Sequence, residues 1–221
     1  MNKIKILLSV LFVVGLAFAI QPANSWTVGA QGKYVPSGAQ ANVTTEGGNV
    51  TPLNFTGSNV STEKWAGYWG NITGSNIILS PGTSIFYSWV WSSVNGGEVC
   101  AVAAPSGFNW VGVQPITAAA IDLIWNFGAQ TDNATSTFTT ACNVDIGGIP
   151  VASVGVLTGV GGFETCAVGD GGATKSDVAF CVNITQNGNL FNGLTGDYEL
   201  MAPTNKTAGT TETHYFWLEL D

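Results

Sequence analysis

Apolar and polar side chains alternate along much of the chain, and the alternation is clearest in residues 62–91. Every second position near the end of this stretch is apolar or aromatic: Ile85, Tyr87, Trp89 and Trp91. The same spacing occurs earlier, at Trp65, Gly67 and Trp69, and two turn signals, Gly74-Ser75 and Ser80-Pro81-Gly82, follow it. Because alternate residues of a strand share one face, we predict three consecutive strands that form the centre of a sheet.

Similar segments recur as far as the C-terminus, and they determine the predicted fold. Further strands are predicted at residues 49–55, 98–104, 149–157, 163–168, 178–184, 196–201 and 214–220. Only residues 116–127 have helical spacing, with Ile121 and Trp125 four positions apart, and extended chain is expected to resume at Asp132. About ten short strands and one short helix indicate an all-β fold, a single β-sandwich of the jelly-roll or immunoglobulin-like kind.

The N-terminus has the layout of a secretory signal peptide. Lys3 and Lys5 precede an apolar run of 15 residues, 6–20, and small residues follow it. Cleavage after Ala19 and cleavage after Ser25 both fit. The alternative is a retained anchor, but a spanning helix needs roughly 20 apolar residues. We therefore expect a signal peptide (1–25), an extended arm (26–48) and a β-sandwich domain (49–221), with no membrane contact in the mature form.

The charge of the chain excludes one class of partner. Removal of residues 1–25 leaves four lysines, no arginine and 14 carboxylates, a formal net charge of −10. A chain without arginine cannot bind phosphate through bidentate contacts, and its negative field repels polyanions. Nucleic-acid binding is excluded on these grounds.

Four cysteines follow the predicted signal peptide: Cys100, Cys142, Cys166 and Cys181. An even number in an exported chain favours two disulfides, and three pairings are possible. The close spacing of Cys166 and Cys181 favours that pair, which leaves Cys100 with Cys142. Because the chain has no Cys-x-x-Cys motif and one histidine, we expect no zinc site.

Asparagine carries the main signal about the surface. Asn-x-Ser/Thr sequons occur at Asn42, Asn49, Asn54, Asn59, Asn71, Asn133, Asn183 and Asn205. Chance accounts for some of them in a chain rich in asparagine and threonine. Five of them nevertheless lie between residues 42 and 71, which indicates an outer face that carries N-linked glycans. The expected location is therefore extracellular, at the surface of a eukaryotic or archaeal cell.

The polar segment after the signal peptide has two interpretations. It has weak apolar alternation, at Trp26, Val28, Ala30, Tyr34 and Val35, and glycine and proline interrupt it. It is either a mobile linker before the first strand or a donor strand that completes the sheet of a neighbouring copy. We keep both interpretations, and the second makes copies of the same chain the expected partner.

Candidate catalytic groups are few. His214, the only histidine, lies in an aromatic strand, which is typical of a structural, half-buried histidine. The acidic residues are scattered and lack a diagnostic partner: Glu98, Asp122, Glu164, Asp170, Asp177, Asp197 and Glu199. We therefore expect no enzyme and no cofactor. A structural calcium ion is the one option left open, with Asp170 and Asp177, or Asp132 and Asn133, as weak candidate ligands.

The tryptophans of residues 62–91 also have two interpretations. If Trp65, Trp69, Trp89 and Trp91 are exposed in a row, they can stack on sugar rings. If they are buried, they form the core of the sandwich, which is the commoner position of aromatic residues on alternating strands. The core interpretation is preferred here.

Several sequence runs resemble a family of exported archaeal surface proteins. They are residues 45–51, TEGGNVT, residues 62–74, TEKWAGYWGNITG, and shorter runs at residues 122–127, 132–135, 196–200 and 214–220. The resemblance spans nearly the whole mature chain, and it implies a secreted β-rich protein without an assigned catalytic site. In general character the chain is also similar to the donor-strand subunits of archaeal surface filaments. It differs from archaeal type IV pilins, since no prepilin-peptidase motif precedes the apolar run.

Together these features predict a secreted, glycosylated, disulfide-stabilised structural subunit of an archaeal filament, pilus or surface layer. The expected mechanism is donation of a β-strand from residues 26–35 to the next subunit. A carbohydrate-binding or adhesion module that uses exposed tryptophans is the alternative.

Overall fold

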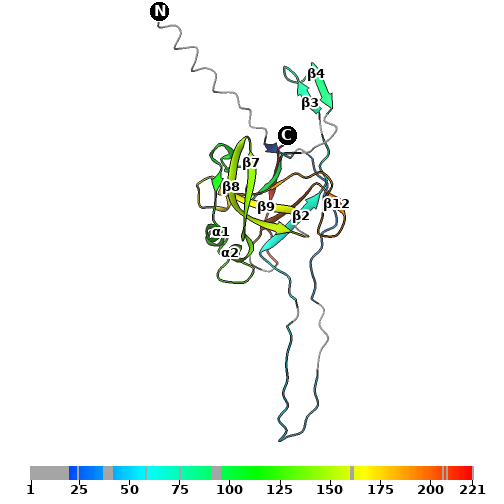
Figure 1. Cartoon of the computed structure of the whole chain (residues 1–221), viewed down its shortest axis with the longest axis vertical. Coiled ribbons are helices and arrows are strands. Elements are labelled where there is room, and N and C mark those ends of the chain that lie inside the picture. Colours follow the sequence, from blue (N-terminus) through cyan, green and yellow to red (C-terminus); the bar gives the residue numbers. More distant parts are fainter. Residues whose placement is uncertain are drawn as a thin grey trace, which may run out of the picture.

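The computed structural model describes residues 20–23, 25–36, 42–57, 59–74, 76–90, 96–159, 162–205, 207 and 209–220. Most of the predicted signal peptide, residues 1–19, lies outside the described residues, as does Trp91. Figure 1 shows a β-rich body from which two segments project, a long loop at one end and a small hairpin at the other. No helix of the described residues has the length and apolar character needed to cross a membrane.

One large antiparallel sheet forms the centre of the body, in the order β1-β14-β5-β10-β9-β8-β7, with β6 added to β9. Its strands are β1 (Gln21–Pro22), β5 (Glu98–Val102), β6 (Gln114–Pro115), β7 (Thr140–Ile146), β8 (Ile149–Thr158), β9 (Phe163–Gly169), β10 (Val178–Asn183) and β14 (Tyr215–Leu218). β5 is buried along its whole length, whereas β7 alternates between exposed and buried residues. Central strands such as β5 therefore contain continuous apolar runs, whereas buried and exposed side chains alternate strictly in β7 at the edge of the sheet.

A second layer covers one face of this sheet. It consists of the pair β2 (Trp65–Gly70) and β13 (Tyr198–Pro203) and of two helices, α1 (Ala118–Trp125) and α2 (Ala134–Thr137). Phe180 of β10 lies between the layers, with its ring centroid 5.7 Å from that of Trp125 and 5.8 Å from that of Phe138. Ten described strands have four or more residues, so the predicted all-β sandwich of about ten strands is confirmed.

The other face of the large sheet curls over a second core. β7 packs against β5 and β10, which are not its neighbours in the sheet. The buried residues inside the curl are small or β-branched, among them Val102, Val144, Ile146, Val168 and all four cysteines. Side chains of this size allow the sheet to close on itself at short distance.

Two disulfides stabilise the large sheet, and they differ from the predicted pairs. Cys100 of β5 bonds to Cys181 of β10, and Cys142 of β7 bonds to Cys166 of β9. The prediction placed Cys166 opposite Cys181, and those residues are indeed cross-strand partners. Cys181 also lies opposite Cys100 on its other side, however, and it bonds to that residue. Spacing along the chain could not distinguish the two neighbours of a central strand.

The Cys142–Cys166 disulfide links strands that are separated by β8. It passes over Gly155, which is opposite Cys166 in the ladder. A Cβ atom at position 155 would lie 2.7 Å from Cys142 Cβ and 3.1 Å from Cys142 Sγ. Glycine is therefore required where the bridge crosses the middle strand.

The predicted helix is confirmed, and a second one was not expected. Thr117 caps α1 by accepting a hydrogen bond from Ala120 N, at 3.2 Å, and Asn126 ends it in the left-handed conformation. Residues 132–140 were predicted to be extended, but Asn133 starts the short helix α2 there. Asp122 of α1 accepts hydrogen bonds from Ala134 N and Thr135 N, at 2.6 and 3.0 Å. A contact between two helices, and not local propensity, forms α2.

The tryptophan-rich stretch does not form the centre of the sheet, which corrects the prediction. β2 pairs with β13, far along the chain, while β3 (Asn76–Leu79) and β4 (Tyr87–Val90) form a separate two-stranded hairpin. The hairpin projects from the body, and its described side chains are exposed (Figure 1). Alternation predicted the strands correctly, but it does not show which surface covers them.

Residues 25–36 and 42–57 contain no helix or strand and are exposed throughout. They belong to the long loop (Figure 1); residues 25–36 are called its first limb here, and residues 42–63, which include the turn at Gly47 and Gly48, its second limb. The strand expected at residues 49–55 is absent, because no neighbouring strand offers hydrogen bonds to it. The remaining described elements are short: η1 (Trp110–Gly112), η2 (Lys175–Asp177), β11 (Gly188–Asn189) and β12 (Thr195–Gly196).

Candidate assembly site

The chain enters the body through a short strand at one edge of the large sheet. In β1, Gln21 lies opposite Leu218 and Pro22 opposite Trp217 of β14, and Ala23 N donates to Phe216 O at 3.0 Å. Ile20 is 6% exposed and belongs to the core inside the curl. Four residues at the N-terminal end of the described chain therefore hold a fixed place in the fold.

The predicted donor-strand residues follow and pair with no strand among the described residues. The exposed fractions are 73% for Trp26, 70% for Val28, 54% for Tyr34 and 78% for Val35, and Ala30 is exposed as well. One ion pair, between Lys33 and Glu63, joins this limb to the second limb of the loop. The structure thus shows an apolar limb without a covering surface.

The far end of the loop is fixed to the body by a polar cluster. The buried Lys64 ammonium bonds to the Asp132 carboxylate, which also accepts from Thr62 Oγ1 at 2.9 Å. Trp65 Nε1 donates to Asp132 O at 2.7 Å. Desolvation raises the pKa of Asp132, but the hydrogen bonds and charge of Lys64 and the hydrogen bond from Thr62 outweigh it and lower the pKa below 3.8. The loop therefore begins at β1 and ends at this cluster.

The eight sequons differ in exposure. Six of the asparagines are exposed: Asn42, Asn49, Asn54, Asn59, Asn71 and Asn183. Asn205 is half-buried, and so is Asn133, whose Oδ1 accepts from Ser136 N at 2.7 Å while its Nδ2 donates to Gly128 O at 3.2 Å. The sequons of the loop all lie on its second limb, so the limb at residues 25–36 carries none.

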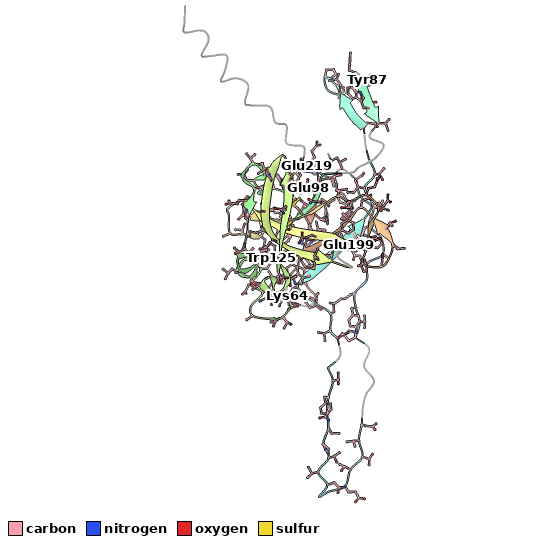
Figure 2. The ribbon with its side chains drawn as sticks, in the orientation of Figure 1. Lys64, Tyr87, Glu98, Trp125, Glu199 and Glu219 are labelled. Carbon is pink, nitrogen blue, oxygen red and sulfur yellow. A yellow bond between two sulfur atoms is a disulfide. The ribbon has the colours of Figure 1, made fainter. Side chains whose placement is uncertain are left out.

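The tryptophans divide between core and surface. Trp65 is half-buried against Phe127, with ring centroids 5.4 Å apart, as the core interpretation predicts. Trp69 and Trp89 are 47% and 48% exposed, so the core interpretation is wrong for both. Trp69 lies beside Phe191, and Trp89 contacts Tyr87, which Figure 2 shows on the hairpin apart from the body.

Most of the acidic residues considered for catalysis hold loops in place. Asp197 accepts from Ile72 N at 2.7 Å and from Asn187 N at 3.0 Å, and Glu199 accepts from Thr158 Oγ1 and Phe191 N. Asp122 caps α2, as described above, and Glu164 accepts from Thr140 Oγ1 at 2.6 Å. Glu98 pairs with Glu219 through the backbone, and both side chains are buried (Figure 2).

His214 is half-buried and its two ring nitrogens have partners. Nδ1 lies 2.8 Å from the Tyr68 hydroxyl and Nε2 lies 2.9 Å from Pro203 O. Because a carbonyl oxygen can only accept, Nε2 carries a proton and Nδ1 accepts from Tyr68 in the neutral ring. Burial lowers the pKa of His214 below 6.5, which agrees with this neutral form. The structural role predicted for this histidine matches the geometry.

The weak calcium candidates are engaged in turns. Asp170 accepts from Asn109 N at 2.8 Å and from Gly172 N at 3.1 Å. Asp177 accepts from Thr174 N and Thr174 Oγ1, at 2.8 and 2.6 Å, and these hydrogen bonds lower its pKa. Within the described residues no group of three or more acidic, histidine or cysteine side chains is placed to hold a metal.

Two open grooves lie on the body. One, of about 350 Å³, is lined by Glu98 and by parts of β7 and β8, with the sequon residue Asn183 at its edge. The other, of about 390 Å³, lies between α1 and the loop at residues 169–173, and Ile116, Leu123 and Ile124 line it. Neither brings together the groups that hydrolysis or transfer chemistry requires.

Comparison of the chain with protein-family models, with curated proteins and with solved structures gave no match. Sequence reasoning missed the place of residues 20–23, because Ile20 ends the apolar run of the predicted signal peptide. It also missed the hairpin surface, although one signal was present: the sequence from Trp65 to Gly97 contains no aspartate, glutamate, lysine, arginine or histidine. A long uncharged stretch is compatible with a surface that another molecule covers.

Proposed function

We propose that this chain is a non-catalytic, exported structural subunit that assembles with copies of itself at the exterior of an archaeal cell. The first limb of the loop, residues 25–36, carries the assembly contacts, and glycans on the second limb limit sideways association. The product is a filament, pilus or surface layer.

One observation carries the proposal: the first limb is apolar at Trp26, Val28, Tyr34 and Val35, yet none of the described residues of its own chain covers it. Exposed extended segments of this kind pair readily with the sheet of another copy. The absence of sequons on this limb supports the same role, because a glycan would block close pairing. The two disulfides fit an oxidising compartment outside the cytoplasm.

Electron microscopy of the secreted protein tests the proposal with a matched pair of variants. The first carries Trp26→Ala, Val28→Ser, Tyr34→Ser and Val35→Ser, which create no new sequon. The second carries Val43→Ser, Val50→Ser, Leu53→Ser and Phe55→Ser, which are equally exposed positions on the second limb and leave its sequons intact. We expect filaments or sheets from the wild type and from the second variant, and none from the first. A wild-type protein that stays monomeric at high concentration contradicts the proposal.

A second candidate function is carbohydrate binding or adhesion, and the exposure of two aromatic pairs favours it. Trp69 with Phe191, and Trp89 with Tyr87, present rings to solvent, as sugar-stacking sites do. Tryptophan fluorescence titration with polysaccharides tests this candidate. Saturable binding that Trp69→Ala or Trp89→Ala abolishes supports it, provided that Val90→Ala has no effect. Val90 is 78% exposed and lies on the opposite face of the same hairpin.

A further inference from the structure

We propose that β1 is an exchanged strand: residues 20–23 of one copy pair with the edge of β14 in the next copy. The place along this edge that β1 fills is called the groove beside β14 below. The inference rests on the proposed function and deepens it, because it names the acceptor site and the segment that enters it. The limb at residues 25–36 then runs between two bodies.

The groove beside β14 is built to receive this strand. It offers a backbone ladder, in which Phe216 O accepts from Ala23 N, and a buried place for the Ile20 side chain. The opposite edge of β14 is already paired with β5. When residues 20–23 leave, β14 loses its hydrogen-bonding partner on this edge, and the core loses the Ile20 side chain. Every copy therefore needs a strand, its own or that of another copy.

The connection between β1 and the rest of the body allows exchange. Residues 25–36 and 42–57 are exposed and contain no helix or strand, and the next strand of the described residues begins at Trp65. An extended segment from residue 24 to residue 64 can span roughly 130 Å. A domain of this size has a radius of gyration of roughly 15 Å. The segment can thus place β1 on a neighbouring body without strain.

The energetics favour exchange at high local concentration. The contacts of β1 itself are the same in the closed and the exchanged form, so these contacts favour neither form. A long tether lowers the effective concentration of the chain's own strand. In the exchanged form Trp26, Val28 and Tyr34 gain a second body to pack on, which they lack in the single copy. Head-to-tail exchange leaves a free donor and a free groove at the ends, so it propagates.

The inference also selects between the two cleavage sites. A cut after Ala19 leaves Ile20 as the first residue and preserves β1. A cut after Ser25 removes the strand. The exported protein is therefore expected to begin at Ile20, which N-terminal sequencing of the protein measures directly. A mature chain that begins at Trp26 overturns the inference.

Disulfide trapping tests the exchange itself. Gln21 and Leu218 are cross-strand partners, so the double variant Gln21→Cys, Leu218→Cys can form a bridge between β1 and β14. The secreted protein is oxidised and run on a non-reducing gel, with each single variant as control. We expect a ladder of covalent oligomers from the double variant. A band at the position of the monomer alone means that β1 stays with its own chain, and overturns the inference.

Microscopy of the same sample separates the two proposals. Filaments together with a monomer-only gel overturn the exchange of β1 but leave the structural-subunit proposal standing. If neither filaments nor a ladder of covalent oligomers is observed, the exchange of β1 and the structural-subunit proposal both fail.

A second pair of variants gives an answer if Leu218→Cys impairs folding. Ile20→Asp places a charge in the core beside β14, whereas Gln21→Asp changes an exposed neighbour. Ile20→Asp retains its groove, so it can accept a strand but cannot donate one. Mixed with wild type in equal amounts, it is expected to shorten the assemblies at least severalfold, and Gln21→Asp to leave their length unchanged. Equal lengths with both variants overturn the inference.

Discussion

Gly155 leaves the space in which the Cys142–Cys166 disulfide crosses β8. The Cys142–Cys166 bridge passes over it, and an added methyl group meets Cys142 Cβ at 2.7 Å and Glu164 Oε1 at 3.0 Å. We expect Gly155→Ala to lower the free energy of unfolding by about 1–3 kcal/mol, the usual cost of overpacking a core. Denaturant titration measures the loss. Gly67→Ala is the control, because Gly67 also lies in a strand and has open space around its Cβ position. Equal midpoints for the two variants contradict the prediction.

His214 makes stability depend on pH. Burial lowers its pKa in the folded state below 6.5, so the unfolded chain binds the proton more tightly. The contribution of the neutral ring is fully present above pH 6.5 and is lost as the pH falls through the folded-state pKa. We expect the difference in unfolding free energy between pH 7.5 and pH 5 to be smaller in His214→Gln than in the wild type. Guanidinium titrations at the two pH values measure it, and because the carboxylates are common to both proteins, an unchanged difference excludes His214 as the cause.

The helix α2 determines whether the sequon at Asn133 can carry a glycan. Both amide atoms of Asn133 are engaged at its N-terminus, and Thr135 Oγ1 donates to Asp122 at 2.6 Å. A glycan on Asn133 would disturb this cap, which is worth about 1 kcal/mol. Glycopeptide mass spectrometry should therefore find glycans on Asn42, Asn49, Asn54 and Asn59, and an unmodified Asn133. High occupancy at Asn133 with little at the loop would contradict the structure.

At the level of elements, the sequence predicted what depends on local pattern. The strands β5, β8, β9 and β10 were found because each is an apolar run between turn residues, and α1 because Ile121 and Trp125 are four positions apart. Pattern could not predict partners that lie far along the chain. β2 pairs with β13, and α2 forms because Asp122 accepts hydrogen bonds from its first residues.

The candidate site was predictable only in part. The exposed apolar limb was visible as weak alternation between Trp26 and Val35, with no sequon in it. The strand at residues 20–23 was not visible, because an isoleucine at the end of an apolar run has the same appearance in a leader and in a core. The cysteine pairing was missed because Cys181 has a cysteine opposite it on each side.

The stability of the whole molecule depends unequally on its two disulfides. The Cys100–Cys181 bridge spans 81 residues of chain and the Cys142–Cys166 bridge spans 24. Loop-closure entropy gives contributions of about 4.5 and 3.4 kcal/mol. Replacing Cys100 and Cys181 by alanine should therefore lower the unfolding midpoint in denaturant more than replacing Cys142 and Cys166. The reverse order would show that strain or residual structure, and not chain entropy, dominates.

The scarcity of basic residues gives the exposed limb a further property. Lys33 is the only lysine or arginine between the start of β1 and the buried Lys64, and its side chain is 56% exposed. A lysine-specific protease thus has one accessible bond in this half of the loop. A cut there leaves residues 20–33 held by the groove beside β14 alone. In an exchanged assembly every joint between subunits would then depend on a peptide that can dissociate, so one cleavage per subunit would disassemble the whole array.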